Sequence, residues 1–469
     1  MIIFIIIFLQ LLFLGTVIFL ESRDPARTIV WLLILGTLPV LGALLFLVFG
    51  RVVRRYRLSK REEVALVQVE SKREEGEDGH MGLPGMRPVS RKLEQLLSLD
   101  AMSRLTYNNR WEVLTNGDET FRALMLALFE AKDHIHMEYY IFQHDMIGWD
   151  IVRILRIKVA DGVKVRILVD GLGSWAFIKS FRHLKKLGIE AAEFYPIRFP
   201  FLTGKLNLRN HRKIVVVDGQ IGFTGGLNVG DEYLSRSKQL GFWRDTFVKL
   251  EGDAVQHLQA VFLHDWSEAT KEKIEDQRYF PPAPSAGSGR VQIVASGPDS
   301  NQEAMLQVFF VALTNAEKSI YLETPYFIPD ESSMMALKTA ALSGLDVRII
   351  VQGVPEYQIT YWAARSFFME LLAVGVRIYS YKKGILHAKI LIIDGEIGSV
   401  GSTNFDERSF RLNFEVTSLI YDSAFAQRLE WDFKQDMNDS EEIWPEEFEQ
   451  RPLGERVKES FARLFSPLL

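Results

Sequence analysis

Two long apolar stretches open the chain, and their length predicts a membrane segment. Residues 2–20 and 29–49 hold no charged side chain, and each is close to the ~20 residues that a helix needs to cross a bilayer. The segment between them, ESRDPART, is short and polar, which predicts a hairpin. A signal peptide would need a basic start and a small-residue cleavage site, and neither is evident. The pattern therefore predicts a transmembrane helical hairpin over residues 1–50, with helices at about 2–20 and 29–49.

The charges that flank this hairpin predict its orientation. Residues 51–61 carry six Lys and Arg side chains, whereas the loop carries two Arg balanced by two acidic residues. Positive charge collects on the cytoplasmic side of a membrane. We therefore expect a multi-pass protein of the cytoplasmic (inner) membrane, with both termini and the catalytic region facing the cytoplasm. Pro39, Gly36 and Gly42 leave open a shallow re-entrant hairpin, which has the same sidedness.

Beyond the hairpin the hydrophobic pattern changes to that of a soluble α/β protein. Residues 51–92 are charged and, toward their end, rich in Gly and Pro, which predicts a basic juxtamembrane segment and linker. From Leu93 onward, helical patterns alternate with short runs rich in β-branched residues. Alternating helices and buried strands indicate an α/β fold.

This alternation occurs twice, with related sequences. AKDHIHMEYYIF, residues 131–142, matches AEKSIYLETPYF, residues 316–327, and DGVKVRILVDG later matches SGLDVRIIVQG. We therefore predict two similar α/β halves, at 93–285 and 286–469, packed about a pseudo-twofold axis. Each half is expected to be a mixed sheet flanked by helices.

The composition of the chain excludes several kinds of site. The 469 residues include no cysteine, which excludes disulfides, thiolate nucleophiles and cysteine-based zinc sites. The formal net charge is −5 and the pI is about 6.1, so bulk charge gives no indication of a nucleic-acid partner. Any anion-binding site must come from a local cluster of side chains.

One motif occurs once in each half. NHRKIVVVDGQIGFTGGLN (210–228) and LHAKILIIDGEIGSVGSTN (386–404) both place, after the His, a Lys at +2, an Asp at +7, a Gly at +14 and an Asn at +17. The β-branched run predicts a strand, on which the His and Lys share a face. Asp-Gly predicts a tight hairpin, and the Gly turn at the end of the return strand brings the Asn back toward the His. One imidazole, one ammonium and one carboxamide therefore converge from each half.

Such a set is half of a site for phosphodiester chemistry. Lys and Asn suit phosphate oxygens, and His acts as a nucleophile or a proton carrier near neutral pH. With two half-sites facing each other, one His attacks phosphorus, while the other protonates the leaving alcohol and deprotonates the incoming one. The predicted catalytic residues are His211, Lys213, Asp218, His387, Lys389 and Asp394. The predicted phosphate-binding residues are Gly226, Asn228, Ser402 and Asn404.

Within this set, Asp218 and Asp394 are assigned to holding the Lys and the turn. The two copies differ where Ser402 replaces Gly226, because Ser offers a hydroxyl to the phosphate or to its own turn and Gly offers only backbone. A third His-x-Lys, at His183, lacks the downstream Gly turn and Asn and lies in a helical pattern. We interpret His183 as a surface residue.

The pattern HxK(x)4D(x)6G(G/S)xN, present twice, resembles the phospholipase D superfamily. The apolar hairpin, GGLNVGDEY and ETPYFIPD extend the resemblance over the whole chain to the bacterial cardiolipin synthases. The resemblance implies that two phosphatidylglycerol molecules react at a membrane to give cardiolipin and glycerol, without a metal, a cofactor or nucleic acid. It leaves the oligomeric state open. It also implies that His211 is the nucleophile, forming a phosphohistidine, and that His387 is the general acid and base, although the reverse order fits equally.

The resemblance further implies a supporting carboxylate downstream of each histidine. Glu415 lies 28 residues after His387, which matches the family spacing. In the first half that position is Gln239, so Asp245 in the triplet WRD is the nearest substitute.

Two other functions remain as alternatives. A phospholipase D-type hydrolase, acting on lipid or as a membrane-tethered nuclease, would share every catalytic residue and let water resolve the phosphohistidine. A nuclease needs a basic, aromatic-lined strand path, which the acidic pI disfavours. An inactive scaffold is disfavoured because both motifs are intact.

Four side chains in apolar strands have a structural interpretation beside a functional one. Glu138 and Glu323 are either satisfied by structural partners, which we favour, or support the site. His134 and His136 alternate at the start of a strand, but no third metal ligand is evident, so we interpret them as structural.

Two apolar segments have similarly open roles. Residues 194–202, FYPIRFPFL, lead into the first motif and are interpreted as an acyl-chain wall or a membrane contact. The tail 454–469 places apolar residues at helical spacing between Arg and Lys, and it fits a membrane-surface helix and a packing helix equally.

Overall fold

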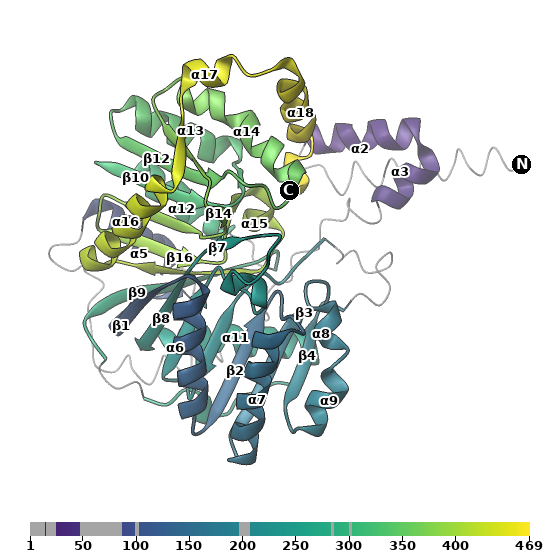
Figure 1. Cartoon of the computed structure of the whole chain (residues 1–469), viewed down its shortest axis with the longest axis vertical. Helices are drawn as coiled ribbons and strands as arrows, with labels where there is room; N and C mark the ends of the chain where they lie inside the picture. The colour runs from purple at the N-terminus through teal and green to yellow at the C-terminus, as the bar shows by residue number, and fades with distance from the viewer. Residues whose placement is uncertain are drawn as a thin grey trace, which may run out of the picture.

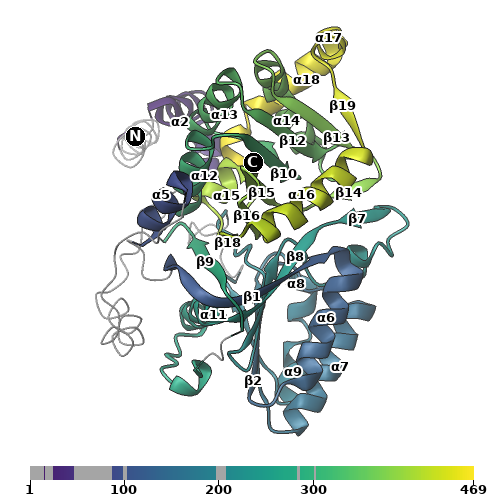
Figure 2. The same ribbon diagram turned by 90° about the vertical axis from the view of Figure 1, so that its left-hand side faces the viewer.

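A computed structural model describes most of the chain as two related halves (Figures 1 and 2). The described residues are Gly15 and the ranges 25–46, 87–98, 103–196, 207–282, 286–299 and 303–469. In Figure 2 the first half, coloured blue to teal, lies below the second half, coloured green to yellow. The two halves meet through one continuous sheet.

The elements of each half follow one another as predicted, with helices alternating with strands. The first-half strands are β1 (Thr106–Thr115), β2 (His134–Tyr139), β3 (Lys164–Asp170), β4 (Glu190–Phe194), β5 (Ile214–Val217), β6 (Ile221–Gly225), β7 (Phe242–Arg244) and β8 (Thr246–Gly252). The first-half helices are α6 (Asn116–Glu130), α7 (Met146–Ala160), α8 (Trp175–Ile178), α9 (Phe181–Lys186), η3 (Asp231–Leu234), α11 (Ala254–Thr270) and η4 (Gln277–Tyr279).

The second half repeats this order and extends it. Its strands are β9 (Gly289–Ser296), β10 (Ser319–Thr324), β11 (Phe327–Ile328), β12 (Asp346–Gln352), β13 (Arg377–Tyr381), β14 (Gly384–Leu386), β15 (Ile390–Ile393), β16 (Ile397–Gly401), β17 (Phe405–Asp406), β18 (Glu415–Ile420) and β19 (Ser440–Ile443). Its helices are α12 (Ala304–Thr314), α13 (Glu331–Leu342), α14 (Gln358–Leu372), α15 (Glu407–Arg411), α16 (Ser423–Asn438), α17 (Pro445–Glu449), α18 (Leu453–Arg463) and η5 (Ser466–Leu468).

In the described part of the chain the sheet has fifteen strands, and its order reads almost the same from either end. It runs β4, β3, β2, β5, β6, β8, β1 and then β9, β18, β16, β15, β10, β12, β13, β19. β1 and β9 pair antiparallel at the centre, so the pseudo-twofold axis passes between them. The prediction of two similar α/β halves about such an axis agrees with this order.

Helices cover both faces of the sheet, which explains why the strands are apolar on both sides. On β2, Ile135, Met137 and Tyr139 pack in the core formed with α6 and α7. The alternate residues of β2 face α11, where His134 contacts Gln259. Figure 1 shows α6 and α7 crossing the front of the first-half sheet and α11 behind it.

The predicted hairpins at Asp-Gly are confirmed. β5 pairs antiparallel with β6, and β15 pairs with β16. Asp218 and Gly219 have φ of 54° and 64°, and Asp394 and Gly395 have φ of 57° and 69°. These are left-handed conformations, which Gly and Asp tolerate better than most residues.

The described part of the apolar N-terminus differs from the prediction. The expected helix at 29–49 is instead two helices, α2 (Pro25–Thr37) and α3 (Pro39–Leu45). The break falls at Leu38, because the proline after it has no N–H and disfavours helical geometry at the residue before it. Among the described residues, no helix combines the length and the apolar character needed to cross a bilayer. The expected helix at 2–20 lies outside the described residues apart from Gly15.

The predicted linker at 51–92 is wrong at its end, where α5 (Pro88–Leu97) forms a helix. Val89, Leu93 and Leu97 recur every four residues and are buried in the core of the second half, against α12. This helix precedes the first half in sequence but packs with the second. The rest of the linker lies outside the described residues.

Candidate active site

Each motif histidine lies at the junction between the two halves. His211 donates its backbone N–H to the carbonyl of Phe414 (2.9 Å), and His387 donates to the carbonyl of Arg244 (2.7 Å). Just before His387, β14 pairs in parallel with β7 of the first half. Both motifs therefore enter their strands, β5 and β15, already tied to the opposite half.

The carboxylates that hold the two imidazoles cross between the halves. His211 Nδ1 lies 3.0 Å from Glu415 Oε2 and 3.1 Å from Oε1. His387 Nδ1 lies 2.8 Å from Asp245 Oδ2. Burial acts to raise the pKa of Glu415, but His211 and Lys213 outweigh it and hold that pKa below its usual value.

This crossing corrects the sequence assignment, which took each carboxylate together with the histidine of its own half. Glu415 begins β18, and Asp245 directly precedes β8. Both strands lie beside the central pair of β1 and β9. From that position each side chain reaches the histidine that enters from the opposite half.

Burial favours the neutral form of both imidazoles. Burial lowers the pKa of His211 to about 4 and that of His387 to about 3. Glu415 opposes the effect at His211, whereas Lys389 adds to it at His387. Around His211 Nδ1, the Glu415 carboxylate and the Ser402 carbonyl (3.1 Å) are both acceptors. The proton therefore belongs on Nδ1, and Nε2 carries the lone pair.

The two motif lysines are buried beside the histidines. Lys213 Nζ donates to the carbonyl of His211 (2.7 Å) and lies 5.6 Å from the ring centroid of Tyr140. Lys389 Nζ donates to the carbonyl of His387 and lies 3.0 Å from its Nδ1. Burial lowers the pKa of Lys213 to about 7 and that of Lys389 to about 8. Two desolvated ammonium groups in one site favour an anionic ligand.

Ser402 contacts a carboxylate, which corrects its assignment as a phosphate ligand. Its hydroxyl donates to Glu415 and accepts from the backbone N–H of Val416 (3.0 Å). The hydroxyl thus links the histidine-supporting carboxylate to the strand that follows it.

In the first half the carboxylate makes that link without a hydroxyl. Asp245 Oδ1 accepts directly from the N–H of Thr246 (2.8 Å), while Oδ2 holds His387. A Cβ added at Gly226 would lie 2.1 Å from Asp245 Oδ1. Gly226 therefore provides the space that this carboxylate occupies, so its predicted role as a phosphate ligand is replaced by a steric one.

The two motif asparagines have different surroundings. Asn228 Oδ1 accepts from the N–H of Ile141 (3.1 Å), and its Nδ2 donates to the Tyr233 hydroxyl (3.2 Å). Asn404 is buried, and its carboxamide oxygen has no partner in the described part of the chain. Asn228 therefore organises the loop after β2, while a phosphate contact of Asn404, through its Nδ2 donor, stays a prediction.

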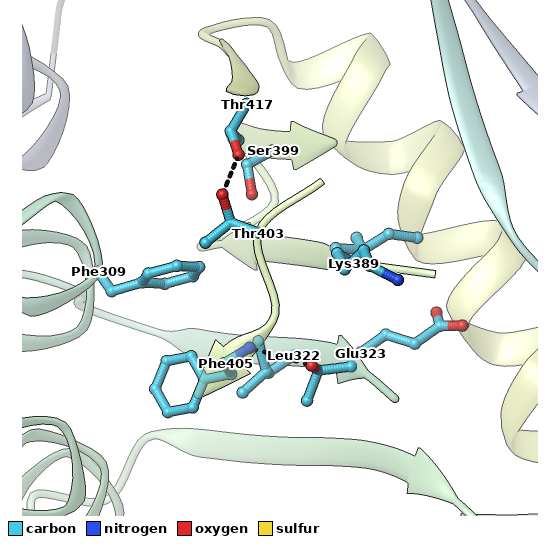
Figure 3. Close-up of a pocket in the computed structure, with 10 residues that line it drawn as sticks. Phe309, Leu322, Glu323, Lys389, Ser399, Thr403, Phe405 and Thr417 are labelled. Carbon is cyan, nitrogen blue, oxygen red and sulfur yellow. Dashed lines mark hydrogen bonds between the residues drawn. The ribbon is translucent and has the colours of Figure 1, made fainter. Parts of the chain in front are cut away.

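A small cavity lies against Lys389 (Figure 3). Its volume is about 10 Å³, roughly the space that one water molecule needs. Glu323, Thr403 and Thr417 are among its lining residues, and the two threonine hydroxyls are 2.9 Å apart. Phe309, Leu322 and Phe405 also line it, so the cavity is a small, mostly apolar space beside the lysine.

Asp218 and Asp394 lie far from the histidines, at the other end of each motif strand. Seven residues of extended chain separate each from its histidine, or ~20 Å. Asp218 accepts from the backbone N–H groups of residues 132–134 at 2.7–3.0 Å, and Asp394 accepts likewise from residues 317–319. They hold the loop before β2 or β10 and form the turn, but they do not hold the lysine.

Glu138 and Glu323 lie in buried charge clusters behind the motif strands. Glu138 accepts from Asn210 Nδ2 (2.5 Å) beside Arg212. Glu323 lies beside Arg244, and neither of its oxygens has a partner among the described atoms. Burial raises both pKa values well above the usual range, with neighbouring aspartates adding to the effect. The contact with Asn210 agrees with the structural interpretation of Glu138, whereas Glu323 lacks the structural partner expected of it among the described residues.

Two buried arginines are functional residues that the sequence did not identify. Arg212 Nε donates to the carbonyl of Glu415 (3.1 Å), and Arg244 Nη1 donates to the carbonyl of Asp245 (2.6 Å). Each therefore fixes the backbone of a histidine-supporting carboxylate. Their own ion-pair partners are Asp265 on α11 and Asp436 on α16. Arg212 follows the first motif histidine directly, but the second motif has Ala388 at that position. Because only residues shared by both motifs were taken as functional, Arg212 was missed.

The remaining predictions have mixed outcomes. His134 and His136 both contact Gln259, in agreement with a structural role. His183 lies on α9, in the helix expected for it. Phe194 is buried in the core, while residues 197–206 of the apolar loop lie outside the described residues.

Comparison with known proteins agrees with this geometry. The family described as "Cardiolipin synthase, PLD-like domain" matches residues 124–266 and 310–437, one match in each half. A cardiolipin synthase of Geobacillus kaustophilus is 43% identical over 98% of this chain and 92% of its own length. A cardiolipin synthase 2 of Bacillus cereus is 45% identical over 97% of this chain and 89% of its own.

The chain belongs to the cardiolipin synthase family of the phospholipase D superfamily. A second family, "Phospholipase_D-nuclease N-terminal", matches residues 2–51, the apolar N-terminus. Among solved structures, phosphatidylserine synthase of Haemophilus influenzae superimposes with a TM-score of 0.62 at 17% identity, covering 81% of this chain and 100% of the other. This likeness shows that the fold is shared. The cardiolipin synthase family membership makes the chain an enzyme of phospholipid synthesis.

Proposed function

We propose that the protein condenses two phosphatidylglycerol molecules into cardiolipin and glycerol through a phosphohistidine. The observation that carries the proposal is the crossed pair of histidine–carboxylate contacts beside two buried lysines. Such a site offers one nucleophile, one proton carrier and two cations for the phosphate, which is what the exchange of one alcohol for another at phosphorus requires.

In the first step, His211 Nε2 attacks the phosphorus of phosphatidylglycerol. The new N–P bond forms as the P–O bond to the terminal glycerol breaks, and His387 in its imidazolium form gives a proton to the leaving oxygen and becomes neutral. The phosphorylated imidazole carries positive charge, which the two oxygens of Glu415 stabilise. The low pKa of His387, with Lys389 3.0 Å from its ring, makes its protonated form a strong acid.

In the second step, His387 acts as the base. It takes the proton from the glycerol hydroxyl of a second phosphatidylglycerol, whose oxygen attacks phosphorus. The N–P bond breaks, cardiolipin leaves, and His211 is neutral again. Lys213 and Lys389 neutralise the non-bridging oxygens throughout both steps.

The setting that we propose is the cytoplasmic membrane, with the catalytic halves on the cytoplasmic face. The apolar stretches before residue 50 and the basic run after it support this placement. As units we propose the first half up to residue 282, and the second half as 286–469 together with α5.

The decisive test incubates the purified protein with phosphatidylglycerol alone and resolves the lipids. Cardiolipin and free glycerol in equal amounts are the expected products. Phosphatidic acid as the sole lipid product overturns the proposal in favour of a hydrolase. His211→Ala is expected to lose turnover, and His183→Ala, at the helical His-x-Lys, is the matched control that keeps it.

A covalent-trapping experiment tests the order of the two histidines. A phosphodiester with a good leaving group needs no acid in the first step, so His387→Ala is expected to gain one phosphatidyl mass and retain it. His211→Ala gains none. The opposite pattern of intact masses assigns the nucleophile to His387.

A further inference from the structure

The C-terminal helix α18 packs on the protein with its charged side inward. Glu459 is 2% exposed and binds Arg365 (3.1 Å) and Arg451 (2.8 Å). Glu455 also binds Arg365, at 2.7 Å. These ion pairs attach the helix to α14. A surface helix of a water-exposed protein normally places its apolar side inward, so α18 is inverted.

The outward side of α18 is apolar. Leu453, Val457, Phe461 and Leu464 share one face at helical spacing, and their exposures are 74%, 60%, 58% and 76%. A stripe of this kind on a monomer marks a surface that another apolar phase covers.

The charges around the stripe indicate what that phase is. Arg456, Lys458 and Arg463 border it, although Lys458 also contacts Trp362 of α14 and Arg463 also binds Glu370 of α14. Both acidic residues of α18 are turned inward. An apolar face bordered by cations fits the boundary of an anionic bilayer. A second copy of this chain would bring the same cations against these, which disfavours a symmetric contact.

Other exposed apolar side chains lie on the same side of the molecule. Figure 1 shows α2, α8 and α18 along the right-hand side. Ile29 and Leu33 on α2 are 57% and 63% exposed. Trp175 on α8 is 61% exposed, with Lys179 Nζ 4.0 Å from its ring centroid. Trp beside Lys is a pairing suited to a headgroup layer.

We propose that α18 docks its outward apolar face on a bilayer of anionic phospholipid. The ion pairs to α14 fix the helix on the catalytic body, so the contact orients that body on the membrane. This inference concerns the surface alone and does not depend on the proposed reaction.

Because the chain has no cysteine, single labels test the contact on the full protein. A spin label at Val457→Cys is compared with one at Leu126→Cys, an exposed position on α6 of the other half. In nanodiscs containing phosphatidylglycerol, the label at 457 is expected to be accessible to oxygen and protected from an aqueous nickel chelate. The label at 126 shows the reverse. Phosphatidylcholine nanodiscs give a weaker difference.

Two results overturn the proposal. One is a label at 457 that the nickel chelate reaches as readily as the label at 126. The other is dipolar coupling between labels at 457 of two chains without lipid accessibility, which assigns the surface to a second copy.

A functional readout separates docking from chemistry. Phe461→Asp and Leu126→Asp replace side chains of 58% and 59% exposure. Phe461→Asp is expected to raise the lipid concentration for half-maximal rate on the order of tenfold at unchanged kcat, and to leave turnover of a water-soluble phosphodiester intact. Leu126→Asp changes neither. Equal behaviour of the two variants contradicts the docking surface, whereas loss of soluble turnover would point to the chemistry.

Discussion

At the scale of single residues, the two halves solve one problem with two pairs of side chains. Each half must hold the opposite histidine and also satisfy the first backbone N–H of the following strand. Asp245 does both itself, and Gly226 leaves the space for it. Glu415 is one methylene longer, and Ser402 completes its contacts with the strand. The Ser and Gly are therefore matched to the carboxylates and not to the phosphate.

This matching predicts that the pairs are exchangeable only together. Gly226→Ser alone places an atom against Asp245 and displaces it from His387, so activity is expected to fall ~100-fold, as when general acid–base catalysis is lost. Gly226→Ser with Asp245→Glu copies the second half and is expected to recover most of that loss. Steady-state rates of the two single variants and the double variant measure the coupling. Additive losses would contradict the matching.

The buried histidines and lysines predict a bell-shaped pH dependence of kcat/KM. The pKa of His211 is lowered to about 4, so its nucleophilic neutral form is lost only as the pH falls through about 4. The ammonium groups have pKa values of about 7 at Lys213 and about 8 at Lys389, so their charge is lost as the pH rises through that range. Rates from pH 3 to 10 on a water-soluble phosphodiester with a good leaving group, which needs no proton from His387, check this. A rate constant that stays level to pH 10 would contradict it.

At the scale of elements, the motif strand separates chemistry at one end from anchoring at the other. His211 lies just before β5, at the junction between the halves, and Asp218 lies just after β5, ~20 Å from the histidine. There the carboxylate accepts three backbone N–H groups from residues 132–134, which ties the end of β5 to the start of β2.

Asp218→Asn is accordingly expected to reduce stability and spare catalysis. Hydrogen bonds to a charged group contribute about 1.5–3 kcal/mol each, so the melting temperature falls while kcat stays within about twofold of the original. Asp150→Asn, at an exposed carboxylate on α7, is the control that changes neither. Thermal unfolding and lipid turnover on the same samples distinguish the cases. A large loss of kcat at an unchanged melting temperature would return Asp218 to the reaction.

Local pattern predicted the strands and hairpins, because side-chain alternation and Asp-Gly turn chemistry act within a few residues. The same-face placement of His211 and Lys213 followed from the strand alone. The crossing of Glu415 and Asp245 did not, because it depends on which strands meet at the centre of the sheet. The burial of Arg212 was likewise invisible, since its partner Asp265 lies on a distant helix.

At the scale of the whole molecule, the continuous sheet joins the two half-sites of one chain into a single site. β1 and β9 join the halves. Ion pairs near the site also connect the two halves, such as that between Arg244 of the first half and Asp436 of the second. Each histidine depends on a carboxylate of the other half, so neither half holds a complete acid or nucleophile.

Mixing two inactive full-length variants tests this unity. His211→Ala and His387→Ala each lack one of the two functions, and both halves of a site lie in the same chain. Their mixture is therefore expected to remain as inactive as either variant alone in a cardiolipin assay. Active enzyme diluted into His211→Ala protein is the control that sets the detection limit. Recovery of activity well above that limit would mean that halves exchange between chains. The centre of the sheet would then open in solution, because β1 and β9 must separate before a half can pair with another chain.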